Sequence, residues 1–198
     1  MTPAEIGSDS ADATQRLALA AFLSALFHPF LLIPFTIVAL TRDLRLSALV
    51  AAATVLPLLA ITLAKLRRGS WGNFDVSDRR QRVGLYAAAI PLTLAGAVLF
   101  SATGAPRQTV QGTLVVAAML VVAFVLSRYV LKVSLHLLFA GWAGVLLGYA
   151  YPPVIAAVPL VLIALGWARR HLERHTRWEV ITGAVIGLTG GAIAVLLP

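Results

Sequence analysis

Seven apolar runs limit what this chain can fold into. They cover residues 17–40, 46–64, 83–102, 109–126, 134–151, 154–168 and 179–197. A helix needs about 20 residues to cross the hydrocarbon core, with a range of about 17 to 25, so the sixth run is short for a span and could be tilted or partly buried. Because lipid offers no hydrogen bonds to the backbone, spans of this kind are helices. We predict an all-α fold, a polytopic transmembrane bundle of six to seven helices.

Composition supports a single membrane domain. Hydrophobic residues make up 60% of the chain and charged residues 12%, about half of what soluble domains carry. Residues 1–15 hold three carboxylates among Ala, Ser and Thr and have no basic segment before an apolar one, so we expect a disordered, solvated tail and not a signal peptide. Residues 16–198 then form one transmembrane domain. The absence of cysteine excludes disulfides, thiolate metal sites and a cysteine nucleophile.

Basic residues predict the orientation. With seven spans, thirteen Lys and Arg side chains fall on one side and three, Arg42, Arg45 and Arg107, on the other. The positive-inside rule then places the N-terminus and the three basic links in the cytoplasm, and we expect a bacterial inner or plasma membrane. The net charge of +8 is explained by topology and by anionic membrane lipids, so nucleic acid is not an expected partner.

Small residues recur at a spacing of four in two of the runs. They are Ala140, Gly144 and Gly148 in the fifth run and Gly183, Gly187 and Gly191 in the seventh. Such faces let helices approach closely in lipid. The fifth and seventh helices either pack on each other through these faces or use them against other neighbours.

The last basic link carries the strongest chemical pattern. His175 and Glu179 are four residues apart, so the carboxylate can accept from one ring nitrogen and leave the other for catalysis. Arg169 precedes them with a guanidinium suited to phosphate oxygens. The plainer interpretation is a solvated basic link whose Glu179 favours a helix N-terminus.

Two other links add candidates. Ser134 suits a helix N-cap, where free N–H groups would accept an anion, and His136 lies just inside that helix with Lys132 just before it. The cluster around Arg79 and Arg82 by itself indicates only topology. His28 precedes a proline inside the first run, and we expect it to bind a carbonyl freed at a kink in preference to a substrate.

The three links together resemble the type 2 phosphatidic acid phosphatase family, with its motifs K-x6-R-P, P-S-G-H and S-R-x5-H-x3-D. The third motif matches at Arg169, His175 and Glu179, with Ala168 in place of Ser and Glu in place of Asp. The second keeps Ser134 and His136.

The first motif of that family is the weakest match. Arg82 stands at the arginine position, but Asp75 occupies the lysine position and Val83 the proline position. Arg79 or Lys132 is the candidate for the missing cation.

This resemblance implies a membrane hydrolase that acts on a lipid phosphate or polyprenyl diphosphate. His175 would attack phosphorus and form a phosphohistidine, Glu179 would orient it, and His136 would protonate the leaving alkoxide and then activate water. The phosphate would be held by Arg169, Arg82, Arg79, Lys132 and the N–H groups near Ser134. Neither a metal nor another cofactor is implied.

Two alternatives remain open. His171, His175 and Glu179 stand at i, i+4 and i+8, which would form a metal-binding stripe on a single helix, although four arginines surround it. The other alternative is a non-enzymatic membrane subunit or a lipid-phosphate-binding bundle, in which the basic links serve topology and headgroup contacts.

Overall fold

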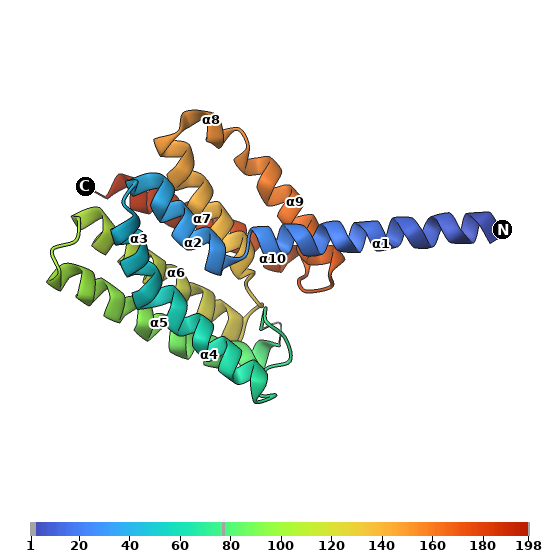
Figure 1. Cartoon of the computed structure of the whole chain (residues 1–198), viewed down its shortest axis with the longest axis horizontal. Helices are drawn as coiled ribbons and strands as arrows, with labels where there is room; N and C mark the ends of the chain where they lie inside the picture. The colour runs from blue at the N-terminus through green and yellow to red at the C-terminus, as the bar shows by residue number, and fades with distance from the viewer. Residues whose placement is uncertain (1–2, 77, 198) are drawn as a thin grey trace.

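The computed structural model describes residues 3–76 and 78–197, with side chains from Asp12 onward, and all regular structure in them is helical (Figure 1). The helices are α1 (Pro3–Leu26), α2 (Pro29–Thr41), α3 (Leu44–Val50), the π-helical turn η1 (Ala51–Val55), α4 (Leu56–Arg67), α5 (Arg79–Ala102), α6 (Arg107–Tyr129), α7 (Leu135–Ala150), α8 (Pro152–Ile155), α9 (Val158–His171) and α10 (Arg177–Leu196). The predicted all-α bundle is confirmed.

Each predicted apolar run is helical, but the helices differ in length. Four segments are long and apolar enough to cross a membrane, namely Leu44–Arg67, Arg79–Ala102, Arg107–Tyr129 and Arg177–Leu196. The pair α1 and α2 gives a fifth if it is one bent span. The 16 residues of α7 and the 14 of α9 are short for a full crossing. The chain has the helices of an integral membrane protein.

The first apolar run is broken at His28. The helices on either side meet at an angle of 50°, because Pro29 begins α2 and cannot continue the hydrogen bonding of α1. We expected the His28 ring to bind a carbonyl freed at the kink, but it does not. Instead its Nδ1 accepts the Phe30 N–H at 3.2 Å and caps α2.

We expected a disordered tail at residues 1–15, and in the structure α1 runs through this segment from Pro3 onward. Asp12 and Arg16 form an i,i+4 ion pair at 2.7 Å on its exposed surface. Met1 and Thr2 lie outside the described residues. In Figure 1, α1 extends away from the rest of the bundle.

A π-helical turn interrupts the second span. It ends two residues before Pro57, which has no N–H to donate to the preceding turn, and the ladder shifts register there. The three pieces α3, η1 and α4 still form one span of 24 residues.

Glycines set the packing of α7 against α10. A Cβ at Gly187 would overlap the carbonyl oxygen of Leu138, and a Cβ at Gly183 would overlap that of Ser134. Of the two alternatives for the small-residue faces, the α10 face follows the first, since Gly183 and Gly187 pack on α7. The α7 face follows the second, because Gly144 and Gly148 face Val158 and Ile155, and Gly141 is the glycine that meets α10.

The three basic links meet at one end of the bundle. Figure 1 shows the loop after α4, the α6–α7 link and the α9–α10 link at the end from which α1 emerges, with the α2–α3 and α5–α6 links at the other. Successive links thus lie at alternate ends of the bundle, as the assignment of basic residues to two sides requires.

Candidate functional site

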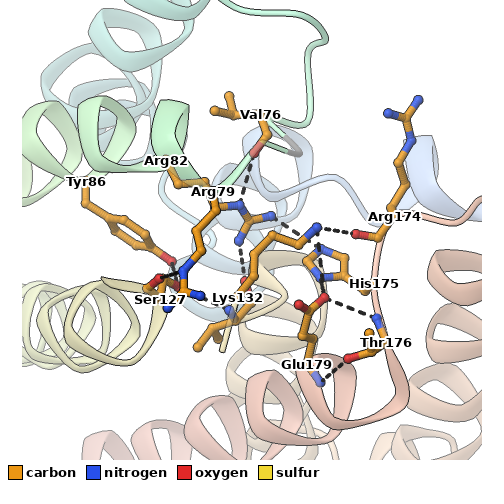
Figure 2. A network of polar contacts seen from close by, with 11 residues as sticks. Val76, Arg79, Arg82, Tyr86, Ser127, Lys132, Arg174, His175, Thr176 and Glu179 are labelled. Carbon is orange, nitrogen blue, oxygen red and sulfur yellow. Dashed lines mark hydrogen bonds and ion pairs between the residues drawn. The ribbon is translucent and has the colours of Figure 1, made fainter. Parts of the chain in front are cut away.

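His175 is held between an acidic and a basic side chain (Figure 2). Its Nδ1 lies 2.9 Å from Oε2 of Glu179, and its Nε2 lies 3.3 Å from Nη2 of Arg82. Because a guanidinium only donates, Nε2 accepts and Nδ1 carries the proton. The predicted orientation of His175 by Glu179 is present.

The start of α10 places this pair. Thr176 is the N-cap, and Glu179 completes a capping box by accepting the Thr176 N–H at 3.1 Å. The same carboxylate oxygen accepts from His175, so the residue that starts the helix also fixes the imidazole. His175 itself lies in the link before the cap, and its side chain is fully buried.

Burial keeps this imidazole neutral. Desolvation lowers the pKa of His175 to about 3, the hydrogen bond to Glu179 opposes this change, and the positive charges of Arg82, Lys132 and Arg169 reinforce it. At neutral pH the ring is therefore unprotonated at Nε2, which is the state a nucleophile needs.

Arg82 connects this histidine to two loops. Its Nε donates to the Val76 carbonyl at 3.0 Å, and its Nη1 donates to the Val133 carbonyl. Val76 has a φ of 47°, a strained conformation for a β-branched residue. This conformation turns the Val76 carbonyl toward the guanidinium, and strain held beside a polar cluster is common at functional sites.

Lys132 lies beside Glu179. Its Nζ donates to the Arg174 carbonyl at 2.6 Å and lies 3.9 Å from Oε2 of Glu179. Burial lowers the pKa of Lys132, and the charge of Glu179 opposes that change. As predicted, Lys132 lies at the cluster.

A second group of polar residues surrounds Asp75, in the loop after α4. Oδ2 of Asp75 accepts from Nη1 of Arg169 at 2.7 Å, while Oδ1 lies 3.8 Å from Nε2 of His136 and 3.7 Å from Nε2 of His28. Nη1 of Arg169 also donates to Ser24 at 2.6 Å. A carboxylate thus stands among one guanidinium and two imidazoles.

The two groups adjoin each other through the α6–α7 link and through Arg169. The Arg169 carbonyl accepts the His175 N–H at 3.2 Å, and the Glu179 carbonyl accepts the Ser134 N–H at 3.1 Å. His136 lies in the first turn of α7, the helix whose N-cap residue is Ser134. The structure therefore brings His136, Arg169 and His175, which are far apart in the chain, into one buried cluster at the basic end.

Several buried polar atoms of this cluster have no hydrogen-bond partner. Of six such side-chain atoms among the described residues, four belong to predicted site residues: Nε and Nη2 of Arg169, Nε2 of His136 and Oγ of Ser134. Buried polar groups are nearly always paired, so each exception needs an explanation. The Arg169 nitrogens and the Ser134 hydroxyl are donors of the kind that bind phosphate oxygens, and Ser134 lies at the N-terminus of α7.

A cavity of about 380 Å³ begins at the same cluster. Its polar end is lined by His28, Asp75, Arg82 and His136, and the rest of its wall comes mainly from apolar residues of α2, η1, α4, α5, α6 and α7. The cluster is thus connected to an apolar chamber inside the bundle.

Arg79 is placed elsewhere. Its Nε donates to the Ser127 carbonyl at 2.7 Å and its Nη2 to the Arg128 carbonyl at 3.1 Å. A guanidinium in this place stabilises the carbonyl end of α6. The structure gives Arg79 a structural contact and does not bring it to the cluster.

The expected metal stripe does not form. His171 ends α9 and stacks on Trp167 with ring centroids 5.1 Å apart, whereas His175 lies in the next link, so His171, His175 and Glu179 do not share one helix.

Another group, His28, Asp75 and His136, has its possible ligand atoms within 4.8 Å of one another. Two contacts disfavour a cation there. Nδ1 of His28 accepts the Phe30 N–H, so the ring carries its proton at Nε2, and the Arg169 guanidinium already binds the carboxylate.

The sequence reasoning missed Asp75 and Ser24 as members of the cluster and placed His28 outside it. The sequence drew attention to Asp75 only because it stands at the lysine position of the first phosphatase motif. A half-buried carboxylate beside one arginine and two histidines requires the loop after α4 to fold over the α6–α7 link, and no local pattern predicts this.

Comparisons with protein-family models, with curated proteins and with solved structures gave no match to this chain.

Proposed function

We propose that this chain is a membrane-embedded phosphatase that acts on a lipid phosphate or diphosphate through a phosphohistidine. The observation that carries the proposal is the group of unpartnered buried atoms on Arg169, His136 and Ser134, beside a neutral and oriented His175. Together they provide a nucleophile, a proton donor and a site for phosphate oxygens.

In the first step, Nε2 of His175 attacks phosphorus and the bond from phosphorus to the leaving oxygen breaks. The developing charge lies beside Arg169 and Arg82, as electrostatic stabilisation requires. Arg82 donates to Nε2 in the substrate-free arrangement, so in this mechanism its guanidinium moves from the nucleophile to the phosphate oxygens. His136 gives the leaving oxygen its proton, with a phosphate dianion stabilising the imidazolium beforehand.

In the second step, His136 takes a proton from water, and the resulting hydroxide attacks the phosphohistidine. The bond from phosphorus to nitrogen breaks, inorganic phosphate is released, and His175 returns to its neutral form. Glu179 remains hydrogen bonded to Nδ1 throughout and stabilises the positive charge that the ring carries as a phosphohistidine.

Asp75 occupies the place that the phosphate needs. Its carboxylate binds Arg169 and faces His136, so it serves as an internal counterion until the substrate arrives. An unpaired arginine buried here would be costly, which explains why an acidic residue lies in an anion site. Substrate phosphate replaces the carboxylate on Arg169.

The test uses purified protein, excess chelator and a panel of lipid phosphates. We expect phosphate release that His175→Ala abolishes and that His171→Ala leaves intact, because His171 lies outside the cluster. Acid quenching during turnover should trap phosphate on His175. Activity that chelator removes would instead support the cation site at His28, Asp75 and His136. A complete lack of turnover on the panel would support a lipid-phosphate-binding subunit.

The proposal includes a cytoplasmic site in a bacterial inner or plasma membrane, since the cluster lies at the end that carries most of the Lys and Arg residues. Substrate would then enter from the cytoplasmic leaflet.

A further inference from the structure

The apolar chamber behind the cluster has its own chemistry. It follows α2 from His28 at one end to Thr41 at the other, where Gln108 and Thr109 also line it. The 13 residues of α2 make this path about 20 Å long at about 1.5 Å per residue. It therefore runs from the basic end of the bundle to the opposite end.

The wall is more apolar than its residue types indicate. Six threonines line it, and five of their hydroxyls donate to the carbonyl four residues earlier in the same helix, at 2.7 to 2.8 Å; these are Thr41, Thr54, Thr62, Thr93 and Thr113. The Tyr86 hydroxyl pairs with Ser127. With these donors already used, the middle of the chamber presents mainly methyl, methylene and aromatic carbon. Away from the polar end, the Trp142 Nε1 is the one donor of the described lining residues that is buried without a partner.

The volume limits the occupant. A cavity of about 380 Å³ that extends along a path of about 20 Å is long and narrow. This shape suits one extended hydrocarbon chain better than two chains side by side. The charged end has Arg82 and His136 for an anionic headgroup, whereas the far end, at Gln108 and Thr109, carries no charge.

We propose that this chamber binds the hydrocarbon tail of a single-chain lipid phosphate, inside the bundle and not on its lipid-facing surface. The inference takes its headgroup site from the proposed function. A straight alkyl chain and an isoprenoid chain share the required chemistry, so both belong in the test.

Gly112 provides a way to fill the chamber. It lines the chamber on α6 near the end far from the cluster, and a Cβ built on it meets nothing within 4 Å. Gly112→Phe therefore adds a ring to open space. Leu114→Phe is the matched control, because Leu114 is on the same helix and 47% exposed on its outer face.

The experiment measures kcat/KM for butyl phosphate, dodecyl phosphate, farnesyl phosphate and two-chain phosphatidate. We expect Gly112→Phe to lower kcat/KM for dodecyl phosphate at least tenfold more than for butyl phosphate, and Leu114→Phe to affect the two equally. A larger loss for farnesyl phosphate than for dodecyl phosphate would identify the isoprenoid as the better fit. Equal losses for all substrates in Gly112→Phe, or efficient use of phosphatidate that the added ring does not change, would overturn the inference.

Binding separates this inference from the proposed function. Dodecylphosphonate, which has no cleavable phosphorus–oxygen ester bond to the chain, is titrated into His175→Ala with and without Gly112→Phe. Tight binding that Gly112→Phe weakens supports the chamber even if no substrate is hydrolysed. Hydrolysis by the unmodified chain without this binding difference supports the phosphatase and rejects the chamber. Should Gly112→Phe not fold, Thr109→Leu fills the same end with a smaller group and the same outcomes apply.

Discussion

Asp75 Oδ2 accepts a hydrogen bond from Nη1 of Arg169 at 2.7 Å, and the Arg169 side chain is completely buried. The contact joins the loop after α4 to the end of α9 through residues 94 positions apart in the chain. It places a negative charge on the guanidinium that the proposed mechanism assigns to substrate phosphate.

Asp75→Asn should raise phosphate affinity. The amide keeps the shape of the side chain but removes the charge that competes with phosphate for Arg169, so we expect the Kd for inorganic phosphate to fall about tenfold, equivalent to about 1.4 kcal/mol. Calorimetric titration measures it. Asp78→Asn removes one charge from the same loop at an exposed position and serves as control. Equal affinity in both variants and in the unmodified chain would mean that phosphate does not bind at Arg169.

Glu179→Gln should separate the two roles of that residue. Glutamine still suits a capping box, so α10 should keep its start, but the neutral amide stabilises a positively charged His175 far less. We expect kcat to fall about a hundredfold, within the usual range for a catalytic proton-transfer or orienting group, with little change in melting temperature. Glu173→Gln in the same link is the control. A variant with full kcat would remove Glu179 from the mechanism.

Stability should decrease on acidification because of His175. Its pKa is about 3 in the folded chain and about 6.5 in an unfolded one, so between these values only the unfolded chain binds the proton. The contribution of the neutral His175 to the free energy of unfolding is complete above pH 6.5. It is lost as the pH falls toward 3, at a slope of at most about 1.4 kcal/mol per pH unit. Melting temperatures from pH 7.5 to 5 should therefore fall less steeply in His175→Gln than in His171→Gln. Parallel profiles would show that His175 titrates normally.

Gly187→Ala should destabilise the bundle and disturb the site together. The added Cβ would overlap the Leu138 carbonyl, and overpacking of this kind costs about 1 to 3 kcal/mol. The melting temperature in detergent should drop. Gly112→Ala adds the same methyl group where nothing lies within 4 Å, and it should be neutral or slightly stabilising. If both variants melt alike, the close contact of α7 and α10 is not what holds them together.

Single cysteines can establish the orientation, since the chain has none of its own. Arg80→Cys lies at the basic end and Arg107→Cys at the opposite end, and both positions are exposed. In intact cells, an impermeant maleimide should label Arg107→Cys and not Arg80→Cys. Labelling of only Arg80→Cys would reverse the orientation and place the cluster outside the cell.

Local sequence patterns were enough to predict the helical class, where the apolar helices lie and the pairing of His175 with Glu179. These depend on local physics: the backbone must bond internally in lipid, apolar run length matches membrane thickness, and residues four apart near a helix start lie close together. Apolar patterning does not predict helix in residues 3–15, where α1 extends beyond its apolar part.

Only the tertiary structure decided which charges meet. Arg79 and Arg82 are three residues apart, yet one binds the end of α6 and the other reaches His175, because the Val76 and Val133 carbonyls face only the second. Asp75 and His28 enter the cluster because the loop after α4 and the break between α1 and α2 both lie against the start of α7. Contacts between residues so far apart in the chain depend on how the helices pack. The residue spacing within any one link does not predict that packing.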